Sequence, residues 1–170
     1  GEGYHAIGTK VANLFENSFS YELDQKNRES IKKNFNLNKI FDGYEIFSKA
    51  DLDFLKDLEK KIEFSKSLFL FDIEGDEFKI LDKNNLSIIK NSYLIIELHH
   101  FYSTEEKVKN LNEELKQYFN IRFCKTENRK FSNFKILDKF NDDEKWLMMS
   151  ESRPATMSWI VCEPININTK

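Results

Sequence analysis

The sequence of 170 residues has no excess of basic residues, no long apolar run and only two cysteines. Its formal net charge is −3, whereas nucleic-acid-binding domains usually carry a basic excess, so we expect no nucleic-acid partner. No apolar run approaches the length that spans a bilayer, so we expect no membrane association. The cysteines, Cys124 and Cys162, form no CxxC pair and have no metal-ligand spacing, which is typical of structural thiols in a cytoplasmic protein.

Several common catalytic motifs are missing as well. There is no P-loop and no GxSxG motif, and neither cysteine adjoins a histidine. Phosphate cradling by a P-loop and nucleophilic catalysis by Ser-His-Asp or Cys-His therefore lack support in the sequence.

The residues that are present indicate one α/β domain over residues 1–170. A content of 40% hydrophobic and 32% charged residues allows a substantial core. Apolar spacing predicts helices over 4–15, 25–35, 52–62 and 104–119, and a short one from Glu77. Strands are expected over 18–23, 44–47, 67–73, 93–98, 121–124 and 157–162. The runs 67–73 and 93–98 favour strands that are buried on both faces. The pattern therefore predicts an α/β sheet with helices on both faces.

Ligands of open α/β sheets bind beyond the carboxyl ends of the strands, which singles out three groups of residues. The first is Gly1 and Gly3, directly before a predicted helix, where small residues let a ligand approach backbone N–H groups. Glu22 ends the next strand, at roughly the 20-residue separation of a carboxylate that holds ribose hydroxyls. These residues favour a nucleoside-containing cofactor, and the alternative is an ordinary glycine loop with a solvated glutamate.

The second group follows the buried strand 67–73. Four acids surround a glycine in the segment Asp72-Ile73-Glu74-Gly75-Asp76-Glu77. We assign Asp72 and Glu74 to a ligand site, because they lie where the sheet opens. Asp76 and Glu77 are interpreted as favourable negative charge at a helix N-terminus.

The third group ends the strand 93–98. Glu97 and His99 share one face, because side chains alternate along a strand. The charge of Glu97 within an apolar strand requires a partner or a functional role, because burying an unpaired charge is costly. A carboxylate beside an imidazole can make it a base near neutral pH. Alternatively, His99 or His100 caps the next helix. Nothing in the spacing demands a metal, and we expect none.

Together these motifs resemble the FkbM-like S-adenosylmethionine-dependent methyltransferases. GEGYHAIG is similar to the second half of their cofactor loop, and YELD to the strand end that binds the ribose. FDIEGDEFKIL followed by YLIIELHH resembles their D-x-E-G-x-E-x-x-L run and E-x-H strand end. ESRPATMSW resembles the ending of some small bacterial members. The resemblance covers nearly the whole chain, in the right order.

The resemblance implies a class I, Rossmann-like sheet of seven strands that binds S-adenosylmethionine and methylates a hydroxyl of a sugar or other small molecule. Gly1, Gly3 and Glu22 would contact the cofactor. The implied roles in catalysis are that Asp72 and Glu74 line the junction of cofactor and acceptor, and that Glu97 and His99 orient and deprotonate the acceptor hydroxyl.

Two further expectations complete this interpretation. Arg129 and Arg153 are candidates for binding an anionic group of the acceptor. The family's first strand is absent, because the sequence opens inside the cofactor loop, and we expect it to precede Gly1 in a longer protein.

Two rival functions remain open. A nicotinamide-dependent oxidoreductase could use a similar sheet, although the D-x-E-G and E-x-H pair disfavours it. A non-catalytic Rossmann-like binding module is favoured by the shortened loop.

Overall fold

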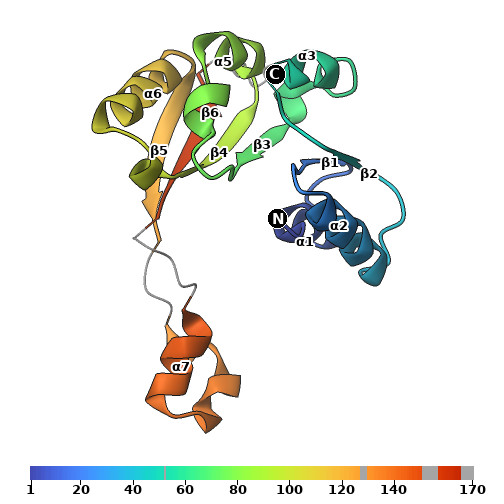
Figure 1. The fold of residues 1–170 in the computed structure, drawn as a ribbon, viewed down its shortest axis with the longest axis vertical. Helices are drawn as coiled ribbons and strands as arrows, with labels where there is room; N and C mark the ends of the chain where they lie inside the picture. Colours follow the sequence, from blue (N-terminus) through green and yellow to red (C-terminus); the bar gives the residue numbers. More distant parts are fainter. Residues whose placement is uncertain (52, 127–129, 151–156, 166–170) are drawn as a thin grey trace. The chain divides into compact units, whose positions relative to one another are not determined.

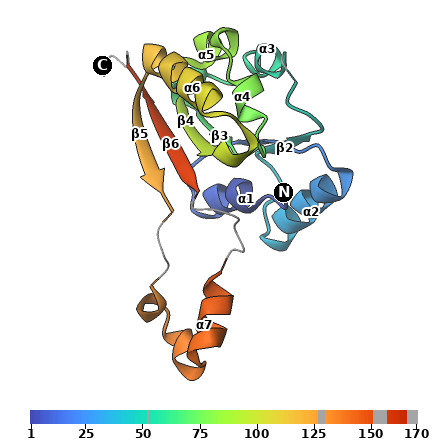
Figure 2. The ribbon, with the colours of Figure 1, turned by 60° about the vertical axis from the view of Figure 1, so that its left-hand side comes forward.

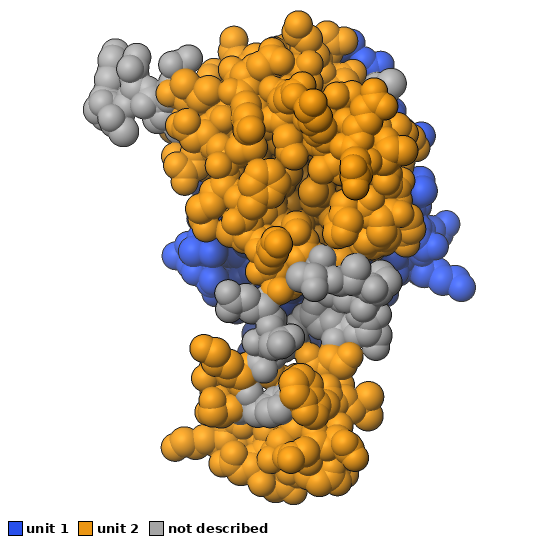
Figure 3. All heavy atoms as spheres, turned by 90° about the vertical axis from the view of Figure 1, so that its left-hand side faces the viewer, with its two compact units in different colours: residues 1–60 blue, residues 61–170 orange. Residues whose placement is uncertain are grey.

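The computed structural model describes the chain except residues 52, 127–129, 151–156 and 166–170. The described residues divide into two compact units, residues 1–60 and residues 61–170, which Figure 3 colours separately. Each unit has its own sheet, and each is treated by itself below. Among the described residues, no helix combines the length and apolar character that crossing a bilayer requires.

The first unit is a two-stranded parallel sheet with three helices (Figure 1). Its strands are β1, Ser18–Tyr21, and β2, Tyr44–Phe47, and its helices are α1, Tyr4–Val11, α2, Gln25–Leu37, and α3, Phe54–Leu58.

A small apolar core joins α1 and α2 to β2. Ile7 of α1 and Ile31 and Phe35 of α2 are buried together. The ring of Phe35 stacks on that of Tyr44 in β2, with centroids 4.0 Å apart and planes at 7°. Burial of such apolar side chains contributes about 1.5–3 kcal/mol each, so these contacts fix the helices on the sheet.

The second unit holds a four-stranded mixed sheet in the order β3-β4-β6-β5. Its strands are β3, Leu68–Phe71, β4, Tyr93–Leu98, β5, Phe119–Lys125, and β6, Ser158–Pro164. β3 and β4 are parallel, whereas β6 runs antiparallel to β4 and β5. The helices are α4, Glu77–Ile80, α5, Lys83–Ile89, α6, Glu105–Tyr118, and α7, Asp142–Met149. α5 and α6 lie side by side over one face of the sheet (Figures 1 and 2).

The core of the second unit lies between this sheet and its helices. Leu94 and Ile96 of β4 are fully buried, as are Leu86 and Ile89 of α5 and Leu115 of α6. The burial of alternate residues of β4 and of Leu115 in α6 follows the predicted apolar patterns.

Several predicted elements are confirmed, β2 and β4 with the same bounds. Asp24 caps α2, because its side chain accepts the backbone N–H of Asn27 at 3.0 Å. The described residues form six strands in two sheets, and the Rossmann-like α/β class is confirmed.

Three expectations need correction. The helix predicted from residue 52 begins at Phe54, with Asp53 at its N-cap position. Asp51 accepts the backbone N–H of Asp53 in the turn that precedes the helix. β3 is not buried on both faces, because Leu70 is 38% exposed. α5 was not predicted, since its seven residues are too few for a clear apolar period.

Candidate functional site

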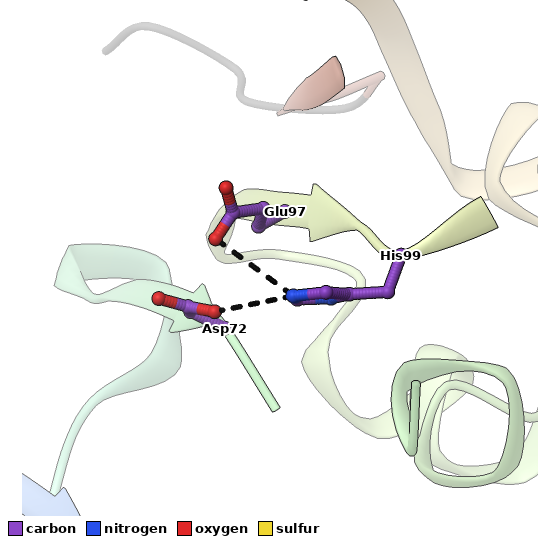
Figure 4. Close-up of side chains that lie close together, drawn as sticks. All are labelled: Asp72, Glu97 and His99. Carbon is purple, nitrogen blue, oxygen red and sulfur yellow. Dashed lines mark ion pairs between the residues drawn. The ribbon is translucent and has the colours of Figure 1, made fainter. Parts of the chain in front are cut away.

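The candidate site lies where the parallel strands β3 and β4 end side by side. Asp72 directly follows β3, Glu97 is the penultimate residue of β4, and His99 directly follows β4. The carboxyl ends of parallel neighbours meet at one edge of a sheet, where open α/β folds bind their ligands. Figure 4 shows Asp72 and Glu97 with carboxylates directed at the imidazole of His99. The structure therefore brings together three of the four residues to which we assigned catalysis.

The fourth, Glu74, joins the same cluster, and all three carboxylates approach one nitrogen. Nε2 of His99 lies 3.6 Å from Oδ1 of Asp72, 3.5 Å from Oε2 of Glu74 and 4.0 Å from Oε2 of Glu97. Such a convergence of acids requires a positive charge between them, because like charges at this separation repel.

The cluster is buried on one side and open on the other. The side chains of His99 and Glu97 are 3% and 4% exposed, whereas those of Asp72 and Glu74 are 36% and 75% exposed. A ligand can therefore reach the carboxylates of Asp72 and Glu74 from solvent, with the imidazole behind them.

A tight turn after β3 brings Glu74 to the cluster. Glu74 has a φ of 54° and Gly75 a φ of 101°, and both lie in the left-handed region that glycine tolerates best. A Cβ on Gly75 would lie 3.1 Å from Cβ of Tyr102, so the turn packs closely against the segment after β4. Tyr102 also stacks beside His99, with centroids 6.2 Å apart and planes at 17°.

Glu77 lies in the first turn of α4, as predicted, and it also belongs to this site. Its side chain is fully buried. Oε2 accepts the N–H of Gly75 at 2.9 Å, and Oε1 accepts the N–H of His99 at 2.8 Å. The signal was present in the sequence, since Glu77 is the last acid of the D-x-E-G-x-E run.

The imidazole is oriented by a different acid from the one we expected. Nδ1 of His99 lies 3.3 Å from Oε1 of Glu77, whereas Glu97 approaches Nε2, on the other side of the ring. A carboxylate that holds one ring nitrogen leaves the other free for chemistry. Glu77 is the carboxylate beside Nδ1, and Nε2 faces the open side of the cluster.

The same cluster has the composition of a metal site. One ligand atom from each of Asp72, Glu97 and His99 lies within 4.8 Å of the other two. His100 does not join them, because its exposed side chain belongs to the 3-10 turn that follows. Arg129 and Arg153 lie outside the described residues.

The three residues expected to hold the cofactor meet in the first unit. Gly3 is the N-cap of α1, with a φ of 86°. Glu22 follows β1 and accepts the backbone N–H of Asp24 at 2.8 Å through Oε1, while Oε2 pairs with the amino group of Gly1. No side chain among the described residues caps α1, and its first turn holds no acid. The start of α1 therefore fits a ligand that accepts hydrogen bonds, next to a carboxylate suited to hydroxyls.

Burial acts to raise the pKa of Glu22, and the hydrogen bond that Oε1 accepts from the N–H of Asp24 acts to lower it, which favours the ionised carboxylate. An ionised carboxylate with two acceptor oxygens is the form that binds a pair of hydroxyls.

The fold has clear relatives among solved structures, although no family model and no curated protein matches the sequence. A Streptococcus pneumoniae protein assigned as a tRNA (m1A22) methyltransferase gives a TM-score of 0.58 at 14% identity over 96% of this chain. A Clostridium thermocellum protein assigned as an rRNA methylase gives 0.58 at 12% identity over 98%. Precorrin 8w decarboxylase of Methanobacterium thermoautotrophicum gives 0.53 at 11% identity over 92%.

The chain has the Rossmann-like fold of these proteins. It spans 60% of the Streptococcus protein, 83% of the Clostridium protein and 74% of the Methanobacterium protein. At such low identity the likeness establishes the fold alone, and the FkbM-like resemblance is not confirmed by a family model.

Proposed function

We propose that this protein is an S-adenosylmethionine-dependent methyltransferase of the FkbM-like type, which methylates a hydroxyl oxygen of a sugar or another small molecule. The observation that carries the proposal is the convergence of Asp72, Glu74 and Glu97 on Nε2 of His99 at the ends of β3 and β4. The fold, shared with proteins assigned as methyltransferases, adds support.

The cofactor would be held in the first unit. Glu22 is suited to the ribose hydroxyls, and the uncapped start of α1 after Gly3 offers backbone N–H groups. When bound, S-adenosylmethionine supplies an electrophilic methyl group on its sulfonium.

The acceptor would be held in the second unit. Asp72 and Glu74 are reachable from solvent and accept hydrogen bonds from hydroxyls, which matches a sugar or another polyhydroxylated molecule. The hydroxyl that is methylated must lose its proton, and that proton passes to the cluster around His99. Glu77 holds the imidazole in place meanwhile. Much of the rate enhancement would come from positioning the hydroxyl.

RNA is the other acceptor to consider, since two of the similar structures are assigned as RNA methyltransferases. The net charge of −3 and the acidic surroundings of the cluster disfavour a polyanionic acceptor. We therefore place small hydroxylated molecules first.

The test has two stages on the full chain. In the first, thermal shift and calorimetry compare S-adenosylhomocysteine with NAD, and we expect stabilisation by S-adenosylhomocysteine alone. In the second, transfer of a labelled methyl group is measured to a panel of sugars and hydroxylated small molecules, with bulk RNA as comparator. Binding of NAD alone would support an oxidoreductase, and binding of neither nucleotide a non-catalytic module. Label transfer to RNA alone would overturn the acceptor class.

A further inference from the structure

We propose that Asp72, Glu97 and His99 bind one divalent cation, which holds the acceptor hydroxyl. This inference rests on the proposed function for the acceptor, but the cation site itself stands on geometry. It also revises the expectation, made from sequence spacing, that the protein binds no metal.

The distances around His99 are those of ligands that share a cation. Nε2 lies 3.6 Å from the nearest oxygen of Asp72 and 4.0 Å from that of Glu97. Both separations exceed the roughly 2.7–3.2 Å of a hydrogen bond with a nitrogen donor. Ligands that each lie about 2.0–2.5 Å from one cation are separated by roughly 3–4.5 Å, as these are.

An imidazolium alone does not account for this arrangement. A protonated Nε2 would close on one carboxylate to about 2.7–2.9 Å, which is the length of a charge-assisted hydrogen bond. Instead three acids stand around it at comparable distances, the nearest at 3.5 Å. Among the described residues, Asp72 and Glu74 have His99 as their ion-pair partner, and neither pairs with lysine or arginine.

The imidazole adds a second indication of a ligand, because a ring that is almost fully buried directs one nitrogen into the cluster. The side chain of His99 is 3% exposed, and its Nε2 lies at least 3.5 Å from each of the three carboxylates, while Nδ1 lies on the other side of the ring and makes no hydrogen bond. Its ring is aimed so that Nε2 faces the carboxylates (Figure 4). Metal-bound histidines commonly direct the nitrogen that does not bind the metal towards a carboxylate, and here Nδ1 lies 3.3 Å from Glu77.

The ligand set indicates the class of cation. Two carboxylates favour Mg²⁺ or Mn²⁺, and one imidazole shifts the preference towards transition metals, so Mn²⁺ is the natural probe. Three protein ligands leave coordination positions open. The acceptor hydroxyl would take one of them, and its proton would be lost more easily beside the cation. With Nε2 occupied, the exposed carboxylate of Glu74 would receive that proton.

The experiment measures Mn²⁺ binding to the full chain after removal of metals with EDTA. Binding is followed by the loss of the free Mn²⁺ signal in electron paramagnetic resonance, without cofactor or acceptor. We expect one site per chain, weakened at least about tenfold by Asp72→Asn. Asp76→Asn is the matched control, because it removes the same charge from the same segment. Among the described residues Asp76 forms its ion pair with Lys79, outside the cluster, so Mn²⁺ binding should stay unchanged.

His99→Gln and His100→Gln form a second matched pair, with the same substitution at adjacent positions. His99→Gln should weaken Mn²⁺ binding at least about tenfold, whereas His100→Gln should not, and circular dichroism checks that each variant folds. Absence of Mn²⁺ binding to the parent, or equal affinities of parent, Asp72→Asn and His99→Gln, would overturn the cation site.

The experiments distinguish a failure of the proposed cation site from a failure of the proposed methyltransferase function. Mn²⁺ binding without S-adenosylhomocysteine binding would keep the site and remove the function. Methyl transfer that persists at full rate in EDTA, together with no Mn²⁺ binding, would keep the function and remove the site.

Discussion

Glu77 and His99, 22 residues apart in sequence, are joined through a single carboxylate oxygen. Oε1 of Glu77 accepts the backbone N–H of His99 at 2.8 Å and lies 3.3 Å from Nδ1 of its ring. The other oxygen accepts the N–H of Gly75. One buried side chain therefore fixes the turn after β3, the end of β4 and the orientation of the imidazole.

This arrangement predicts a large loss of stability in Glu77→Ala. The substitution leaves two part-buried or buried backbone N–H groups without an acceptor, and each such group costs about 1–3 kcal/mol. We expect the free energy of unfolding, measured with urea, to fall by at least about 2 kcal/mol. Asp76→Ala, at the exposed neighbour, should change it by no more than about 0.5 kcal/mol. Similar losses in the two variants would contradict the role of Glu77.

The sequence predicted the strands of the site better than its hydrogen bonds. β4 and the sharing of one face by Glu97 and His99 followed from alternation, which is a local property. Which acid holds which ring nitrogen depends on the turn at Glu74 and Gly75, and such a turn has no apolar period. For that reason Glu77 was assigned to the start of a helix alone, although it also lies at the centre of the site.

The short helices and the exposure of β3 were predicted least well. α5 has only seven residues, and α3 begins two residues later than predicted, since helix boundaries follow from the apolar period only to within one or two residues. The partial exposure of β3 could not be predicted either. It depends on the position of β3 at the edge of its sheet and on what covers the sheet there, and not on the strand's own residues.

A second prediction concerns Glu22 and the cofactor. Charge-assisted hydrogen bonds of a carboxylate with ribose hydroxyls contribute roughly 1.5–3 kcal/mol. Glu22→Ala should therefore weaken S-adenosylhomocysteine binding by about ten- to a hundredfold, measured by calorimetry. Glu29→Ala is the control, because Glu29 is exposed on α2 and its carboxylate accepts a hydrogen bond from Gln25 of the same helix. Unchanged affinity in Glu22→Ala would remove this residue from the cofactor site.

A third prediction separates binding of the cofactor from the chemistry. His99→Ala should lower turnover by about 10²–10⁴-fold, because the acceptor loses the group that takes its proton or ligates its cation. Affinity for S-adenosylhomocysteine should stay nearly the same. His100→Ala should keep most of the turnover, since the side chain of His100 is exposed and lies outside the cluster. Equal losses of turnover at the two positions would mean that the end of β4 has a structural role only.

The last prediction follows from Cys162, whose fully buried side chain lies in β6. Burial raises the pKa of this thiol from 9.0 to about 12. Because the folded pKa lies above the unfolded one, the thiol favours the folded state fully below about pH 9, and this contribution is lost as the pH rises towards 12. Between pH 8 and pH 10 the free energy of unfolding should fall by about 1 kcal/mol through this group. Urea unfolding at both pH values measures the fall. Cys162→Ala should abolish that part of it, whereas Cys124→Ala, at the half-buried thiol of β5, should retain it. An equal fall in parent and Cys162→Ala would show that the thiol of Cys162 does not set the alkaline stability.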